Sequence, residues 1–124
     1  MKLNKLTTLL VVESIEACLP TWQSLGYAVQ VRVPEAGTLD FAILSSEAGE
    51  LMLQTRRSLK DDLPDVDKLR PSHLLYADVA SLDQAKKALP RARVIVSERS
   101  TFYGAKEAWL ELEDGCVLGL AEHA

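Results

Sequence analysis

The chain has 124 residues, of which 48% are apolar and 26% are charged, a balance typical of one ordinary globular domain. Fourteen Lys and Arg against eighteen Asp and Glu give a net charge of −4, which argues against a nucleic-acid partner because binding phosphates needs a basic surface. Two cysteines exclude a disulfide scaffold, and two histidines leave little material for a His-rich metal site.

The amino-terminal segment MKLNKLTTLLVV has two lysines before an apolar run, as a secretory signal has. That run is short and contains two Thr, and Glu13 and Glu16 stand where a signal needs small residues. No stretch approaches the roughly 20 apolar residues of a membrane-spanning helix. We therefore expect a first strand over Leu6–Val12 in a cytoplasmic protein that does not bind membranes.

The first half of the chain has the pattern of a strand, a helix and three further strands. Ser14 stands at a helix N-cap position, and Gly26 stands where that helix ends. Pro20 lies inside the helical pattern and predicts either a late start or a kink near the middle. The apolar face of the helix comprises Ile15, Cys18, Leu19, Trp22 and Leu25.

Three strands are expected after this helix. The alternation of Tyr and Val over Tyr27–Val33 predicts a half-buried strand. The other two strands are predicted over Leu39–Ser45 and Glu50–Gln54, with turns over Pro34–Gly37 and Glu47–Gly49.

Residues 56–72, RRSLKDDLPDVDKLRPS, carry nine charged residues and two prolines. This composition indicates a solvated connector with at most one short helical turn. The functional alternative is that Arg56 and Arg57 flank the mouth of a pocket.

The pattern then restarts. A strand is expected over His73–Val79, and Ser81 is placed to cap a helix that ends at Pro90. The apolar face of this helix comprises Leu82, Ala85, Ala88 and Leu89. The remaining strands are expected over Arg93–Glu98, Lys106–Leu112 and Cys116–Glu122, with a tight turn at Asp114-Gly115.

The two halves of the chain form an internal repeat. VVESIEA at 11–17 matches DVASLDQ at 78–84 at an offset of 67 residues, and SSEAGELML at 45–53 matches ELEDGCVLG at 111–119 at an offset of 66. Both halves therefore read β-α-β-β-β. Such a unit cannot cover one face of its own sheet, so two units are expected to combine.

Paired β-α-β-β-β modules in a chain of this length resemble the vicinal oxygen chelate superfamily, which includes glyoxalase I, extradiol dioxygenases and bleomycin-resistance proteins. LTTLLVVESIEACLPTWQSLGY at 6–27 is similar to the opening strand and helix, which end on an aromatic-x-x-Leu-Gly-aromatic pattern. TFYGAKEAWLELEDGCVLGLAE at 101–122 is similar to the closing hairpin, although its Glu113-Asp114-Gly115 turn lacks the usual proline.

The resemblance implies an α+β fold in which the two modules form a curled mixed sheet around a cleft. We expect residues 1–124 to form a single domain, made of module 1 (1–55), the charged connector (56–72) and module 2 (73–124). Small members of the family usually pair, so the resemblance also implies a homodimer.

Metal-using members bind a divalent ion with four side chains, one from the first and one from the last strand of each module. The resemblance places these positions at Thr7, Gln54, Leu74 and Gly119, and of these only Gln54 can coordinate a metal. We therefore expect no metal and no cofactor, and the prediction leans away from an enzyme. His73 adjoins Leu74, but alternation points it away from the cleft unless a bulge reverses it.

Without a metal, a cleft recognises its ligand by shape, aromatic contact and a few polar groups. Met52 shares the strand face of Gln54, which either bonds a ligand or is satisfied within the sheet. Trp109 matches Ile43 in the repeat, and both face the cleft or the core. Trp22, on the first helix, is expected in the core.

Four further candidates come from the closing hairpin. Phe102 and Tyr103 lie in the loop before it, where the family often places ligand contacts. Glu107 and Glu111 share the parity of Trp109, so they either meet a cationic ligand or lie solvated at the rim. The predicted ligand-binding residues are Gln54, Met52, Trp109, Ile43, Phe102, Tyr103, Glu107 and Glu111.

Two functions follow from this set of residues. The preferred one is a bleomycin-resistance-like protein that sequesters an aromatic or cationic small molecule, a drug or a metabolite, in a metal-free cleft. The alternative is a metal-dependent lyase or dioxygenase of the same superfamily. The sequence names neither the ligand nor a catalytic residue.

Overall fold

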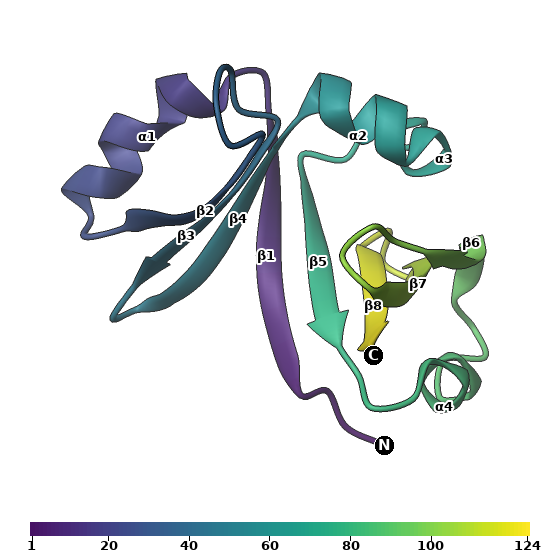
Figure 1. The fold of residues 1–124 in the computed structure, drawn as a ribbon. Coiled ribbons are helices and arrows are strands. Elements are labelled where there is room, and N and C mark those ends of the chain that lie inside the picture. The colour runs from purple at the N-terminus through teal and green to yellow at the C-terminus, as the bar shows by residue number, and fades with distance from the viewer. The chain divides into compact units, whose positions relative to one another are not determined.

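The computed structural model describes all 124 residues, and they pack as two units. The first unit is Thr8–His73, and the second consists of Met1–Thr7 together with Leu74–Ala124. The elements of the first module are β1 (Lys5–Val12), α1 (Ile15–Ser24), β2 (Ala28–Val33), β3 (Phe41–Ser46) and β4 (Gly49–Thr55), coloured purple to blue in Figure 1. None of the helices is long and apolar enough to pass through a bilayer.

The sheet of the first unit is mixed. β4 runs parallel to β1 and antiparallel to β3, which in turn pairs antiparallel with β2. Helix α1 packs on one face of this sheet (Figure 1). The core on that face consists of Ile15, Leu39, Ala42, Leu44, Leu51 and Leu53, all nearly or fully buried.

Two predictions for the first unit are corrected. Helix α1 begins at Ile15 and contains Pro20, so the late start is wrong. Strand β2 is not half-buried by alternation, because a register shift between Val29 and Val31 breaks the pattern. Val29 is 37% and Val31 41% exposed, and they lie opposite Leu44 and Ile43 on β3.

The charged segment 56–72 is more structured than its composition indicates. It forms α2 (Arg56–Asp62), capped by the Thr55 hydroxyl at 3.1 Å from the Ser58 amide, and α3 (Pro64–Asp67). Leu59, Leu63 and Val66 are buried at helical spacing. The segment therefore has a small apolar core of its own beneath a charged surface.

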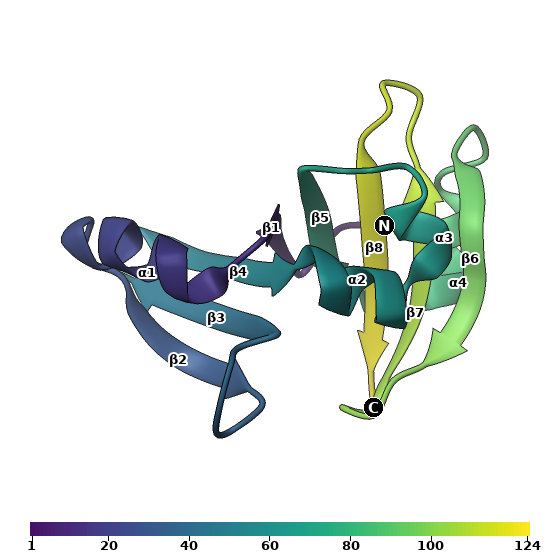
Figure 2. The same ribbon diagram turned by 90° about the horizontal axis from the view of Figure 1, so that it is seen from above.

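The second unit repeats the architecture of the first. Its elements are β5 (His73–Asp78), α4 (Leu82–Lys87), β6 (Arg93–Ser100), β7 (Ala105–Glu111) and β8 (Val117–His123). Their sheet order is β5-β8-β7-β6, in which β5 and β8 are parallel and the other pairs antiparallel (Figure 2). Helix α4 covers one face, whose core is formed by Ala77, Val79, Leu82, Ala85, Ala108, Leu110, Leu118 and Leu120.

Matching local structure confirms the internal repeat. The Ser14 hydroxyl accepts a hydrogen bond from the Ala17 amide, and the Ser81 hydroxyl accepts one from the Gln84 amide, both at 3.2 Å. These caps are 67 residues apart, as the alignment of the halves predicts. The α+β fold with two β-α-β-β-β modules is confirmed.

Candidate functional site

The candidate site lies on the face of the second unit's sheet that α4 leaves uncovered. On β7, Ala108 and Leu110 pack toward α4, so Glu107 and Trp109 point to the opposite face. Across the neighbouring strands, Trp109 is paired with Gly119 on β8 and Val96 on β6. The open face therefore carries a carboxylate beside an indole.

Glu107 is fully buried and accepts hydrogen bonds on both carboxylate oxygens. Its Oε2 accepts bonds from the hydroxyls of Tyr76 and Tyr103. Its Oε1 accepts a bond from Arg99 Nε at 3.0 Å and one from Trp109 Nε1 at 3.1 Å, and Arg99 Nη2 lies 3.0 Å away. A buried carboxylate is costly unless it is paired and hydrogen-bonded, and this one is both.

The environment keeps both phenols protonated. Burial, followed by the hydrogen bond to Glu107, raises the pKa of Tyr103 to about 12. The same two causes raise the pKa of Tyr76 well above its usual range. At neutral pH both hydroxyls therefore serve as hydrogen-bond donors to Glu107.

Gly119 makes room for the Trp109 indole. A Cβ atom at Gly119 would lie 2.6 Å from the indole Cη2, closer than real Cβ contacts. Tyr76 stands beside Gly119 on β5, and its ring centre lies 5.9 Å from that of Trp109 at a tilt of 40°. Gly119 thus lets the two rings meet across the sheet.

A short loop places two further aromatic side chains at this site. Phe102 and Tyr103 lie between β6 and β7, with ring centres 5.0 Å apart and an edge-to-face arrangement. Phe102 is 90% exposed and Tyr103 48%, whereas Trp109 is buried. We call the group Tyr76, Arg99, Phe102, Tyr103, Glu107 and Trp109 the Glu107 site.

The other predicted residues lie elsewhere. Glu111, at the far end of β7, accepts a 2.8 Å hydrogen bond from Arg93 Nε and is a half-buried member of that ion pair. Both predicted acids, Glu107 and Glu111, therefore already have an arginine partner. This pairing favours an aromatic ligand over a cationic one.

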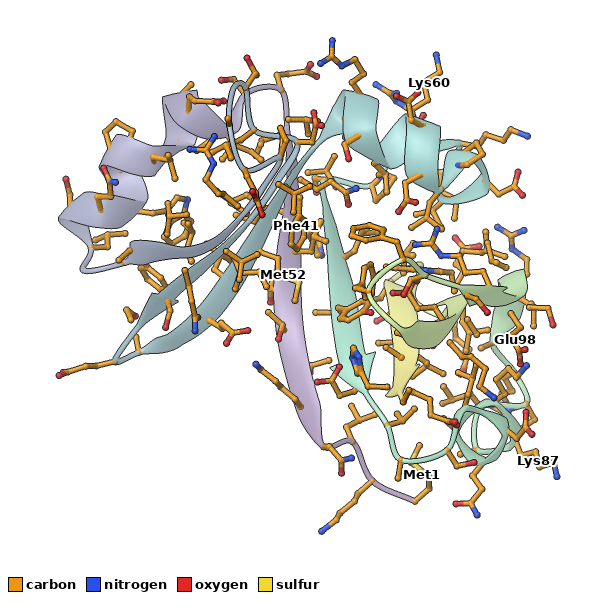
Figure 3. All side chains as sticks on the ribbon, in the orientation of Figure 1. Met1, Phe41, Met52, Lys60, Lys87 and Glu98 are labelled. Carbon is orange, nitrogen blue, oxygen red and sulfur yellow. The ribbon has the colours of Figure 1, made fainter.

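Ile43, Met52 and Gln54 form a separate group on the first unit. Ile43 is paired with Met52 and Phe41 with Gln54 across the β3–β4 hairpin, on the sheet face away from α1. Figure 3 shows Phe41 and Met52 on this side. The Gln54 amide donates a 3.0 Å hydrogen bond to Ser58 Oγ, so Gln54 is satisfied within its own unit.

Comparisons with known proteins rest on the fold. No protein-family model and no curated protein matches the sequence. A glyoxalase/bleomycin resistance protein/dioxygenase superfamily member from Vibrio splendidus 12B01 is similar in structure, with a TM-score of 0.71, 15% identity, and 95% of this chain and 97% of that chain covered. Methylmalonyl-CoA epimerase from Mycobacterium tuberculosis is similar with a TM-score of 0.69, 15% identity, and coverage of 98% and 89%.

The chain has the fold of the vicinal oxygen chelate superfamily. A third similar structure, a hypothetical protein from Bacillus halodurans C-125, has a TM-score of 0.70, 19% identity, and coverage of 99% and 94%. At these identities the likeness concerns the fold alone.

The fold family implies a metal ion in some members, so the four expected ligand positions were tested against the strand register. Val11 is paired with Gln54 on the first unit, and Asp78 is paired with Ala121 on the second. The offset is 67 in both strands, so the repeat partner of Gln54 is Ala121, and Gly119 is the repeat partner of Met52. The fourth expected position therefore moves by two residues.

The residues at these positions do not fit a divalent metal. Leu74, Ala121 and Gly119 have no donor atom in their side chains, and the Gln54 amide is engaged with Ser58. Thr7 is buried and offers only a hydroxyl. His73 is exposed and lies 3.1 Å from Ser72 Oγ, whereas the adjacent Leu74 is buried. No group of three or more His, Cys, Asp or Glu could hold a metal ion.

Two residues of the Glu107 site were missed by sequence reasoning. Tyr76 lies two residues after Leu74 on the same strand, so alternation from Leu74 would have found it. Arg99 could not be found in this way, because the β6 register shifts between Val94 and Val96 and again between Val96 and Arg99.

Proposed function

We propose that this protein binds a planar aromatic small molecule at the Glu107 site and sequesters it, as a bleomycin-resistance-like protein would. The observation that carries the proposal is the gathering of four aromatic side chains around one satisfied carboxylate. Phe102 stands almost wholly in solvent at the tip of a short loop. An exposed aromatic side chain beside partly buried ones offers a surface on which a flat ligand can stack.

The chemistry of the site supports binding more than catalysis. A general base needs a free lone pair that faces the substrate, but donors occupy both oxygens of Glu107. A general acid works best with a pKa near neutral pH, but the pKa values of Tyr76 and Tyr103 are raised. The aromatic surface is what remains for a ligand.

The cellular setting is part of the proposal. We propose that the protein works in the cytoplasm as a homodimer, as small proteins of this fold do. Size-exclusion chromatography with light scattering tests the dimer.

The chain contains two tryptophans, and this allows a direct test of the site. Trp22→Phe leaves Trp109 as the sole indole, in the Glu107 site. Trp109→Phe leaves Trp22, which packs against Tyr27 at 5.5 Å on the first unit. Bleomycin, 9-aminoacridine and 2-naphthol serve as cationic and neutral aromatic probes.

We expect saturable quenching of indole fluorescence in Trp22→Phe and little quenching in Trp109→Phe. Phe102→Ala, a change at an exposed position, should weaken the affinity about fivefold because one stacking surface is lost. Equal quenching in the two single-tryptophan variants, or no saturable quenching by any probe, would overturn the proposal.

A further inference from the structure

The four polar groups that hold Glu107 differ in where they come from. Tyr76, Arg99 and Trp109 lie on β5, β6 and β7, and strand pairing fixes their positions. Tyr103 lies in the loop between β6 and β7. Only the Tyr103 hydroxyl can leave the carboxylate without separating strands.

The loop is built so that its tip can move while its base stays closed. At the base, Thr101 and Ala105 exchange backbone and hydroxyl hydrogen bonds of 2.9 to 3.2 Å. At the tip, the bond from Tyr103 to Glu107 fastens the loop to the sheet. Its neighbour Phe102 is 90% exposed, so swinging the tip outward exposes little new apolar surface.

The departure of Tyr103 would leave a particular vacancy. Oε2 of Glu107 would keep the Tyr76 bond and lose its second donor, and the space of one phenol ring would open beside Trp109 and Tyr76. A buried carboxylate oxygen that has lost a donor is costly, so a donor from elsewhere would be bound there favourably.

We propose that Tyr103 is an internal stand-in for the ligand, and that the ligand is a neutral planar aromatic molecule whose phenolic hydroxyl replaces that of Tyr103 on Glu107. This inference rests on the function proposed above and names the class of ligand. The exchange substitutes one neutral donor for another, so the charge balance between Glu107 and Arg99 is kept. A cationic ligand would instead stand close to the Arg99 guanidinium and meet repulsion.

The proposal gives Tyr103 an effect on affinity. While its hydroxyl occupies Glu107, only the fraction of molecules with the loop tip turned out can bind, and the apparent affinity falls by that fraction. Removing the hydroxyl removes this competition while leaving the aromatic ring of the residue.

The test measures the binding of three naphthalenes by calorimetry. The probes are 2-naphthol, which donates a hydrogen bond, 2-methoxynaphthalene, which does not, and 2-naphthylmethylammonium, which is cationic. The variant is Tyr103→Phe, and the matched control is Tyr27→Phe, which removes a tyrosine hydroxyl on the first unit. Circular dichroism checks that each variant is folded.

We expect the unmodified protein to prefer 2-naphthol over the other two probes, and Tyr103→Phe to bind 2-naphthol about tenfold more tightly. The affinity for 2-methoxynaphthalene should change much less, and Tyr27→Phe should behave as the unmodified protein. The inference is overturned if Tyr103→Phe binds 2-naphthol no better, or if the methoxy or cationic probe binds as well as the phenol. In those cases saturable quenching of Trp109 by the naphthalenes would still uphold the proposed function, whereas loss of all binding would remove both.

Discussion

Among single residues, Glu107 has the largest influence on the second unit's open face. Leaving a buried carboxylate without its partners costs about 3–5 kcal/mol, so the sheet and loop must supply donors for it. The matching rung of the first unit is Phe41 with Gln54, and that of the second is Glu107 with Ala121. The polar residue has changed strands between the modules, and the aromatic site exists only where it stands on β7.

Gly119 is the residue whose substitution we expect to be most costly for its size. In Gly119→Ala the new methyl group would press on the six-membered ring of Trp109, and overpacking of this kind costs about 1–3 kcal/mol in the free energy of unfolding. Urea unfolding measures this cost.

A double-mutant cycle with Trp109→Phe provides the control for that experiment. The clashing atoms Cη2, Cζ2 and Cζ3 are absent from phenylalanine, so the cost of Gly119→Ala should fall in that background. An undiminished cost would show that the glycine is needed for another reason.

Much of the site could be read from residue parity. Alternation along β7 places Glu107 and Trp109 on one face, and the loop position of Phe102 and Tyr103 follows from their place before the hairpin. Arg99 lies beyond two register shifts, and no period-2 pattern survives such shifts. That Glu107 is satisfied rather than free could not be predicted, because three of its partners come from other elements.

At the level of elements, the helix caps were the most readable signals. Ser14 and Ser81 each begin a helix as predicted, because a serine hydroxyl replaces the missing acceptor of the first turn. The strands were placed to within about two residues, the usual uncertainty of boundaries. The segment 56–72 was misjudged because its charges hide Leu59, Leu63 and Val66, which meet only once two short helices fold.

The caps give a quantitative prediction. Ser14→Ala and Ser81→Ala should each lower the free energy of unfolding by about 1 kcal/mol, because each leaves one amide of the first turn without its acceptor. Chemical denaturation followed by circular dichroism provides the measurement.

Ser97→Ala, at an exposed position on β6, is the matched serine substitution and should change stability by less than about 0.5 kcal/mol. If the cap variants lose no more stability than Ser97→Ala, the hydroxyl bonds at the caps contribute nothing to the fold.

For the whole molecule, the common offset of 67 residues relates the two modules strand by strand. It assigns Thr7, Gln54, Leu74 and Ala121 to the positions that hold a metal in metal-using relatives of this fold. These side chains supply one amide and one hydroxyl, which is a poor donor set for a divalent ion.

We accordingly expect no thermal stabilisation by Ni²⁺, Zn²⁺, Mn²⁺, Fe²⁺ or Co²⁺. A ligand that binds only the folded state raises the melting temperature with its concentration, so a thermal-shift series reveals any specific ion. Elemental analysis of the purified protein complements it. Stoichiometric metal, or a melting temperature that climbs with metal concentration, would contradict the donor-set argument and make the lyase or dioxygenase the leading function.

The membership of Met1–Thr7 in the second unit has a consequence for how the chain folds during synthesis. The Asn4 amide donates a 2.8 Å hydrogen bond to the Asp78 carbonyl, and Thr7 is buried, so the earliest residues belong to the unit completed last. At a ribosomal rate of about 5–20 residues per second, their partners follow only after several seconds. The first segment to leave the ribosome is thus among the last to find its place, and the gene cannot be divided between its two repeats without dividing the second unit as well.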